Sequence, residues 1–157
     1  MRPKRAASPF EPLVLCVAAL ICLGHPVGGL ALAQSDSTGT LVIRITGVAS
    51  GNARLRIAVF NSEKSWPDDA SAVYKTVLDA ADPEHEWRIQ NVPAGEYAIA
   101  VFHDKNGDGK LNRNFLGIPS EPYGFSNNAR GSLGPARWND AKFVVATGTN
   151  ELEIKIK

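Results

Sequence analysis

The residues most able to do chemistry in this sequence lie between positions 104 and 112, where side chains that carry oxygen atoms recur at alternate positions. Gly109 stands at the sixth position of this segment, where a metal-binding loop turns sharply. The spacing is typical of a loop that curls around one calcium ion, which prefers carboxylate, amide and carbonyl oxygens. The predicted ligands are the side chains of Asp104, Asn106, Asp108 and Asn112 and the backbone carbonyl of Lys110.

The loop lacks the last ligand of an EF-hand. Its twelfth position is Phe115, which cannot supply the bidentate carboxylate required there. Glu121 is the predicted substitute, because a turn at residues 117–119 would fold it back onto the loop. Lys105 and Arg113 add positive charge nearby, so we expect a weak site with a dissociation constant of about 10⁻⁴ to 10⁻³ M. The alternative is a turn whose Asn and Asp side chains satisfy its own backbone.

A second candidate is the irregular stretch from Asn112 to Trp138. Loops of this length in a compact domain are usually functional or disordered, and the aromatic residues in this one argue against disorder. It offers a binding surface to a small molecule, a glycan or an envelope protein, or forms a lid over one end of the fold, and the two roles can coexist. The predicted ligand-binding side chains are Tyr123, Phe125, Asn127 and Asn128.

Acid–base catalysis is suggested by His103 beside Asp104 at the end of an expected strand. No serine or cysteine has a recognisable nucleophile setting, and no paired-histidine spacing is present. We therefore expect a protein that is not an enzyme. The competing hypothesis is a hydrolase that works at residues 103–128, which would need His103, Asp104 or Glu121 close together in a pocket.

The elements that would position these residues are almost all strands. Residues 40–47 and 54–60 alternate apolar and polar side chains, with Arg54 and Arg56 on a solvated face, and a turn at 51–52 predicts a hairpin between them. The pattern predicts an all-β chain, folded as a single antiparallel β-sandwich of about seven strands, immunoglobulin-like or prealbumin-like. The expected strands are residues 40–47, 54–60, 73–78, 86–92, 96–103, 141–146 and 151–157.

Residues 1–33 have the pattern of a secretory signal peptide of the Sec type. Basic residues open the chain, an uncharged apolar run spans residues 13–23, and a small-x-small cleavage site ends at Ala33. The run is shorter than the roughly 20 residues needed to span a membrane, so we expect cleavage after Ala33 and no transmembrane segment thereafter. Residues 34–39 are expected to be flexible, and residues 40–157 to form the β-sandwich domain.

The charge of the processed chain argues against nucleic acid as a partner. The formal net charge is +1 for the whole chain, and removing Arg2, Lys4, Arg5 and Glu11 with the signal peptide lowers it to −1. A nucleic-acid binder would instead be expected to carry a basic patch.

Three segments together resemble one known family. They are residues 93–104, 106–111 and 114–128, which read PAGEYAIAVFHD, NGDGKL and NFLGIPSEPYGFSNN. They are similar to the DUF2141 family of bacterial secreted proteins, and the resemblance extends from about Leu41 to Ile156. It implies a bacterial β-domain in the periplasm or outside the cell, with no assigned activity. We therefore expect a secreted or periplasmic binding or structural module, in which a calcium ion orders the long aromatic loop.

Overall fold

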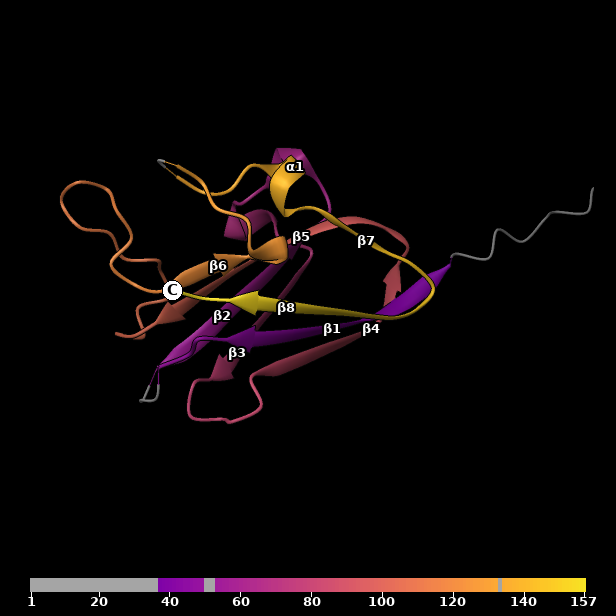
Figure 1. Ribbon diagram of the computed structural model, residues 1–157, viewed down its shortest axis with the longest axis horizontal. Helices are drawn as coiled ribbons and strands as arrows, with labels where there is room; N and C mark the ends of the chain where they lie inside the picture. Colours follow the sequence, from indigo (N-terminus) through magenta and orange to yellow (C-terminus); the bar gives the residue numbers. More distant parts are fainter. Residues whose placement is uncertain (1–36, 50–52, 133) are drawn as a thin grey trace, which may run out of the picture. The chain divides into compact units, whose positions relative to one another are not determined.

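The computed structural model describes residues 37–49, 53–132 and 134–157. Strands dominate these residues and form two sheets, in agreement with the predicted all-β class (Figure 1). The strands are β1 (Thr38–Thr46), β2 (Arg54–Phe60), β3 (Tyr74–Asp79), β4 (Glu86–Pro93), β5 (Gly95–Asp104), β6 (Tyr123–Phe125), β7 (Phe143–Val145) and β8 (Gly148–Lys155). The helical elements are 3₁₀ turns at Glu63–Ser65, Asp69–Ser71 and Ser126–Asn128, and the single turn α1 (Trp138–Ala141).

The smaller sheet has three strands in the order β4-β1-β8. β1 lies in the middle, with Ile43 opposite Trp87 of β4 on one side and Leu152 of β8 on the other. It runs antiparallel to β4 but parallel to β8, which corrects the prediction of a purely antiparallel fold. Alternation of side chains predicts which face of β8 is buried, but it carries no information about the direction of the neighbouring strand.

The larger sheet has five strands. Its order is β3-β2-β5-β6, and β7 pairs with the first residues of β5. β2 and β5 run antiparallel, with Arg56 opposite Phe102. The predicted hairpin of β1 with β2 is wrong, because the two strands lie in different sheets. Each finds its two hydrogen-bonded neighbours elsewhere, β1 in β4 and β8, and β2 in β3 and β5.

Both sheets contribute to one hydrophobic cluster. Alternate residues of β1, β2, β5 and β8 are buried in it, among them Leu41, Ile57, Ile99 and Ile154. The apolar alternation of these strands is thus explained, because one face of each strand turns toward the shared cluster.

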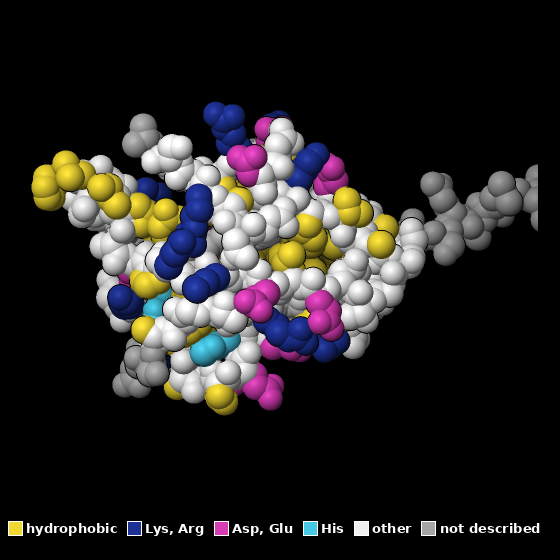
Figure 2. Space-filling view, in the orientation of Figure 1, with side chains coloured by type: hydrophobic (Ala, Val, Ile, Leu, Met, Phe, Trp, Pro, Cys, Tyr) yellow, Lys and Arg dark blue, Asp and Glu magenta, His cyan; other side chains and the backbone are white. Residues whose placement is uncertain are grey.

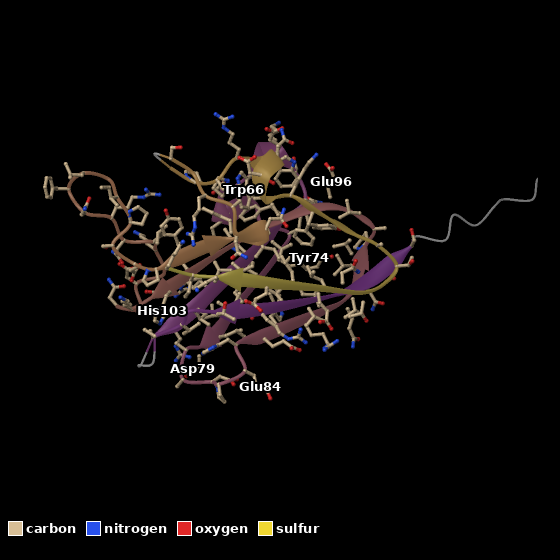
Figure 3. The ribbon with its side chains drawn as sticks, viewed as in Figure 1. Trp66, Tyr74, Asp79, Glu84, Glu96 and His103 are labelled. Atoms are coloured by element: carbon tan, nitrogen blue, oxygen red, sulfur yellow. The ribbon has the colours of Figure 1, made fainter. Side chains whose placement is uncertain are left out.

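The opposite face of β2 and β5, called the outer face below, carries a second hydrophobic cluster. Trp66 lies at its centre, with its ring centroid 5.2 Å from Phe60, 5.4 Å from Phe125 and 6.1 Å from Trp138 (Figure 3). The indole N–H of Trp66 donates to the carbonyl oxygen of Ala136 at 2.8 Å. These edge-on aromatic contacts fix the segment that follows β6 onto the sheet.

The long stretch that the sequence predicts to be irregular contains strand β6 and the 3₁₀ turn Ser126–Asn128, and α1 begins at its last residue, Trp138. Because β6 pairs with β5, the described residues hold eight strands rather than about seven. The predicted signal peptide lies outside the described residues. Within them, no helix combines the length and apolar character needed to cross a bilayer.

Candidate functional site

Asp104, the last residue of β5, is the buried anchor of the loop that follows it. Its carboxylate accepts hydrogen bonds from the backbone N–H groups of Gly107 at 2.8 Å and Gly109 at 3.0 Å. Both glycines have positive φ angles, of +75° and +82°, which favour glycine. A third donor is Nε of Arg56 on β2, which lies 2.6 Å from Oδ2 of Asp104. An arginine of the neighbouring strand thus neutralises the first predicted calcium ligand.

The pKa of Asp104 results from opposing effects. Burial is the largest single influence and raises the pKa of this carboxyl. Hydrogen bonds from Arg56, Gly109 and Gly107 together outweigh burial, and they hold the pKa below its ordinary value. The group is therefore a charged carboxylate at neutral pH, with one guanidinium and two N–H groups as donors.

Asp108 accepts hydrogen bonds from two amide side chains of the loop. Its Oδ2 lies 3.0 Å from the side-chain nitrogens of both Asn106 and Asn112, and its Oδ1 accepts from the backbone N–H of Lys110 at 2.8 Å. The predicted side-chain ligands are therefore divided between two groups, one around Asp104 and one around Asp108. Oδ1 of Asn112 is buried and has no hydrogen-bond partner among the described residues.

Glu121 folds back onto the loop, at the place where the sequence predicts a further carboxylate. Its Oε1 accepts from the N–H of Lys105 at 2.8 Å and its Oε2 from the N–H of Asn112 at 3.0 Å. This buried carboxylate ties the two ends of the loop together. In the part of the chain that the structure describes, no group of three or more His, Cys, Asp or Glu side chains is arranged to hold a metal. Calcium binding at the loop stays a prediction.

Sequence reasoning missed the role of Arg56. The interpretation of a solvated strand face fits Arg54, whose exposed side chain pairs with exposed Asp79 at 3.4 Å. Arg56 is only 32 % exposed, and its guanidinium packs beneath Gly109, where an added Cβ would lie 3.3 Å from it. No spacing along the sequence links residue 56 to residue 104, and the contact follows from the pairing of β2 with β5.

His103 points to the opposite side of β5 from Asp104. Its ring is buried, and neither ring nitrogen has a hydrogen-bond partner among the described residues. Burial, followed by the charge of Lys105, lowers the pKa of His103, so the ring is neutral at pH 7. The adjacency of His103 and Asp104 in the sequence therefore does not make a hydrogen-bonded catalytic pair.

The four predicted ligand-binding residues connect the segment after β6 to the rest of the fold. The ring of Tyr123 lies 5.6 Å from the guanidinium carbon of Arg130. The ring of Phe125 lies 5.4 Å from the indole ring of Trp66. The Asn127 amide donates to the backbone carbonyl of Lys142 at 2.8 Å, and Asn128 Oδ1 accepts from the backbone N–H of Lys155 at 2.8 Å. These contacts are those expected of a lid, and a ligand-binding role for the four stays a prediction.

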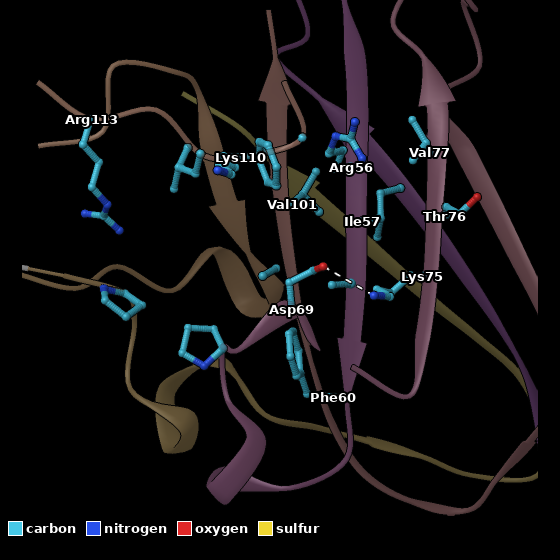
Figure 4. Close-up of a pocket in the computed structure, with 17 residues that line it drawn as sticks. Arg56, Ile57, Phe60, Asp69, Lys75, Thr76, Val77, Val101, Lys110 and Arg113 are labelled. Carbon is cyan, nitrogen blue, oxygen red and sulfur yellow. Dashed lines mark hydrogen bonds and ion pairs between the residues drawn. The ribbon is translucent and has the colours of Figure 1, made fainter. Parts of the chain in front are cut away.

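A pocket of about 550 Å³ opens on the outer face of the larger sheet (Figure 4). Strands β2, β3 and β5 form its floor, where Ala58, Val77, Ala100 and Phe102 present apolar atoms. Residues 109–111 line one side, and the segments that precede β3 and α1 line another. None of the predicted ligand-binding residues reaches this pocket, and neither do His103, Asp104 and Glu121.

Positive charge surrounds the apolar floor. Arg56, Lys75, Lys110 and Arg113 reach the pocket from β2, β3 and the loop after β5. Asp69 is the one carboxylate among the lining residues, and it pairs with Lys75 at 3.4 Å (Figure 4). Lys110 and Arg113 have no ion-pair partner in the described part of the chain, so their charges are available to a bound anion.

Comparison with known proteins gives one family and a distant structural likeness. The family model of DUF2141, described as an uncharacterized protein conserved in bacteria, matches residues 43–153. No curated protein matches the chain. Two structures of the pilus-presented adhesin Spy0125 (Cpa), one of them a cysteine-to-alanine mutant, are similar at 14 % and 15 % identity, with TM-scores of 0.33 and 0.32. Each match covers 76 % of this chain and 27 % of the adhesin chain, so the chain spans about a quarter of the adhesin's length.

Proposed function

The chain belongs to the DUF2141 family, and because a fold does not fix a function, we propose from the site itself that the protein binds a small amphipathic anion. The ligand lies in the pocket on the outer face of the larger sheet, with its apolar part on Ala58, Val77 and Ala100. Its negative group meets Lys110 and Arg113. The observation that carries the proposal is this combination of an apolar floor with two unpaired cations at its edge.

The size and character of the pocket support a small ligand. Binding sites for small molecules usually enclose about 300 to 1,000 Å³ and combine mostly apolar walls with a few polar groups that fix orientation. The pocket of about 550 Å³ falls within this range. Arg56 and Lys75 already pair with Asp104 and Asp69. The two remaining cations favour a ligand with negative charge, because an unpaired cation near an apolar surface attracts an anion more strongly than it does in bulk water.

The scaffold in this proposal is a β-sandwich exported by the signal peptide to the periplasm or beyond. Two sheets that share one hydrophobic cluster support the sandwich. The hydrolase alternative is less well supported, because the pocket is lined by no histidine, serine or cysteine. Binding without chemistry is the function that the pocket supports best.

A fluorescent probe and its uncharged analogue test the proposal. Anilinonaphthalene sulfonate carries one negative charge on an apolar ring system, and N-phenyl-naphthylamine offers similar rings without the charge. We expect the sulfonate to bind at least tenfold more tightly. The double variant Lys110→Gln/Arg113→Gln should remove this preference, and the matched variant Lys64→Gln, at an exposed lysine outside the pocket, should keep it.

The floor of the pocket is tested by Val77→Trp, which places an indole in the pocket from an exposed position of β3. We expect both probes to bind at least tenfold more weakly to this variant, because the indole occupies the apolar floor. Unchanged affinity of both probes in Val77→Trp would show that they bind elsewhere, and the proposal would then fail.

A second candidate function is calcium binding by the loop of residues 104–112. One observation favours it: the buried Oδ1 of Asn112 has no partner among the described residues, and the amide of Asn112 lies against the Asp108 carboxylate. Because Arg56 already neutralises Asp104, the affinity should be low. The calcium titration described in the Discussion tests this candidate.

A further inference from the structure

The segment between β5 and β6 ends in an apolar tip that no other described residue covers. Phe115 is 95 % exposed, Leu116 67 % and Ile118 56 %. Figure 1 shows this segment extending away from the strands, and Figure 2 shows hydrophobic side chains gathered at its end. Single exposed apolar residues are ordinary, but three within four positions at the end of a loop form a patch that usually meets a partner.

The backbone of the tip makes most of its hydrogen bonds within the tip itself. The N–H groups of Leu116 and Ile118 donate to Oδ1 of Asn114, at 3.0 and 3.1 Å. The N–H of Asn114 donates to the carbonyl of Ile118, and that of Gly117 to the carbonyl of Asn114, both at 2.9 Å. Nη1 of Arg113 donates to the carbonyl of Gly117 at 2.9 Å. Pairing these backbone groups within the loop reduces the number of hydrogen bonds that are lost when the tip leaves water.

The charged side chains of residues 109–120 are positive. These residues contain no Asp or Glu, and Lys110 and Arg113 precede Phe115 by five and two residues. Arg130 extends over Tyr123 at the base of the same loop. Apolar side chains at a tip, followed by cations closer to the body of the protein, match the layers of an anionic bilayer, where headgroup phosphates lie above hydrocarbon.

We propose that Phe115, Leu116 and Ile118 insert into the surface of an anionic phospholipid bilayer, while Lys110 and Arg113 bind the headgroups. A bilayer fits the observations better than a protein partner. The tip is convex and protruding, and a convex apolar patch needs a preformed hydrophobic pocket in a protein but no preformed pocket in lipid. The internally bonded backbone is required in hydrocarbon and is not required in a wet protein interface. This inference does not depend on the ligand in the outer-face pocket.

The test is flotation of the purified chain with vesicles of phosphatidylcholine that contain 30 % phosphatidylglycerol. The triple variant Phe115→Ser/Leu116→Ser/Ile118→Ser removes the apolar tip at exposed positions, so it should fold normally. We expect vesicle affinity to fall on the order of 1,000-fold, because burial of each of the three side chains is worth roughly a factor of ten. Val144→Ser is the matched control, since Val144 is a 66 % exposed apolar residue of β7. Both variants keep the same N-terminal residues, so any affinity of that segment cancels.

Two further measurements keep the proposal open to refutation. Phe115→Trp should bind like the unmodified chain, and its added fluorescence should shift to the blue and be quenched by brominated lipid. Vesicles of pure phosphatidylcholine should bind several-fold more weakly, and salt should remove this difference. Equal flotation of the triple variant and the unmodified chain would overturn the proposal. So would an absence of flotation combined with concentration-dependent self-association that the triple variant abolishes, because a second copy would then cover the tip.

Discussion

Replacing Arg56 by methionine tests whether the ion pair with Asp104 holds the loop. Asp104 is fully buried, and Arg56 Nε lies 2.6 Å from its Oδ2. Breaking a buried ion pair on one side costs about 3–5 kcal/mol, because a charge is left buried without its partner. Arg56 is one third exposed, and Asp104 keeps two backbone donors, so we expect a smaller loss of about 2 kcal/mol in the free energy of unfolding.

The matched control is Arg54→Met, two residues earlier on the same strand face. Arg54 pairs with Asp79 at 3.4 Å, and both side chains are more than half exposed, so this loss should stay below about 1 kcal/mol. Urea unfolding at pH 7 measures both variants. A double-mutant cycle with Asp104→Asn should give a coupling energy of at least about 1 kcal/mol for Arg56. Equal losses in the two arginine variants, or a coupling energy near zero, would refute the reasoning.

The same variant gives the sharpest test of calcium. In the unmodified chain the guanidinium already neutralises Asp104, so millimolar calcium should raise the melting temperature only slightly. In Arg56→Met the Asp104 carboxylate lacks a cation, and calcium should stabilise this variant more. An ion at ten times its dissociation constant contributes about 1.4 kcal/mol. If calcium shifts neither melting curve relative to chelator, calcium binding by this loop is disproved.

Three further predictions concern side chains around the loop and the lid. The lowered pKa of His103 means that the unfolded chain binds its proton more readily, so stability should fall as pH drops below about 6.5, and His103→Leu should flatten this part of the pH profile measured by urea unfolding. Glu121→Gln should cost about 2 kcal/mol and speed hydrogen exchange at Lys105 and Asn112, since one of these N–H groups would face an amide donor instead of a carboxylate oxygen. Trp66→Ala should lower the free energy of unfolding by about 3 kcal/mol, because it removes the aromatic packing. Trp66→Phe should lower it by only about 1 kcal/mol, because it removes the hydrogen bond of the indole N–H and keeps an aromatic ring.

The strands could be predicted because their alternation reflects burial directly. The apolar residues of β1, β2 and β8 that face the shared cluster recur at every second position, and the predicted bounds of these strands agree with the observed ones to within three residues. Their partners could not be predicted in the same way. Leu152 and Ile154 require a buried face, but that requirement is met equally by a parallel or an antiparallel neighbour.

The loop shows the same division between local and long-range information. Its glycines and its Asx-type hydrogen bonds involve residues close in the sequence. The spacing from Asp104 to Asn112 therefore predicts a tightly turned loop even when the fold is not known. Arg56 enters from 48 residues away, and a charged side chain on a strand usually points to water. For the same reason Asn127 and Asn128 suggest ligand binding in the sequence, while their partners in the structure are backbone groups 15 and 27 residues later.

The segment between β5 and β6 contributes both to the pocket and to the apolar tip, and this has a physical consequence. Lys110 and Arg113 line the pocket and also precede Phe115, so a bilayer that binds the tip brings its headgroups close to the pocket. An amphipathic anion bound by Lys110 competes with those headgroups for the same cations. Vesicles should therefore lower the affinity of the pocket for the sulfonate probe, and removal of the tip by the triple serine variant should restore that affinity.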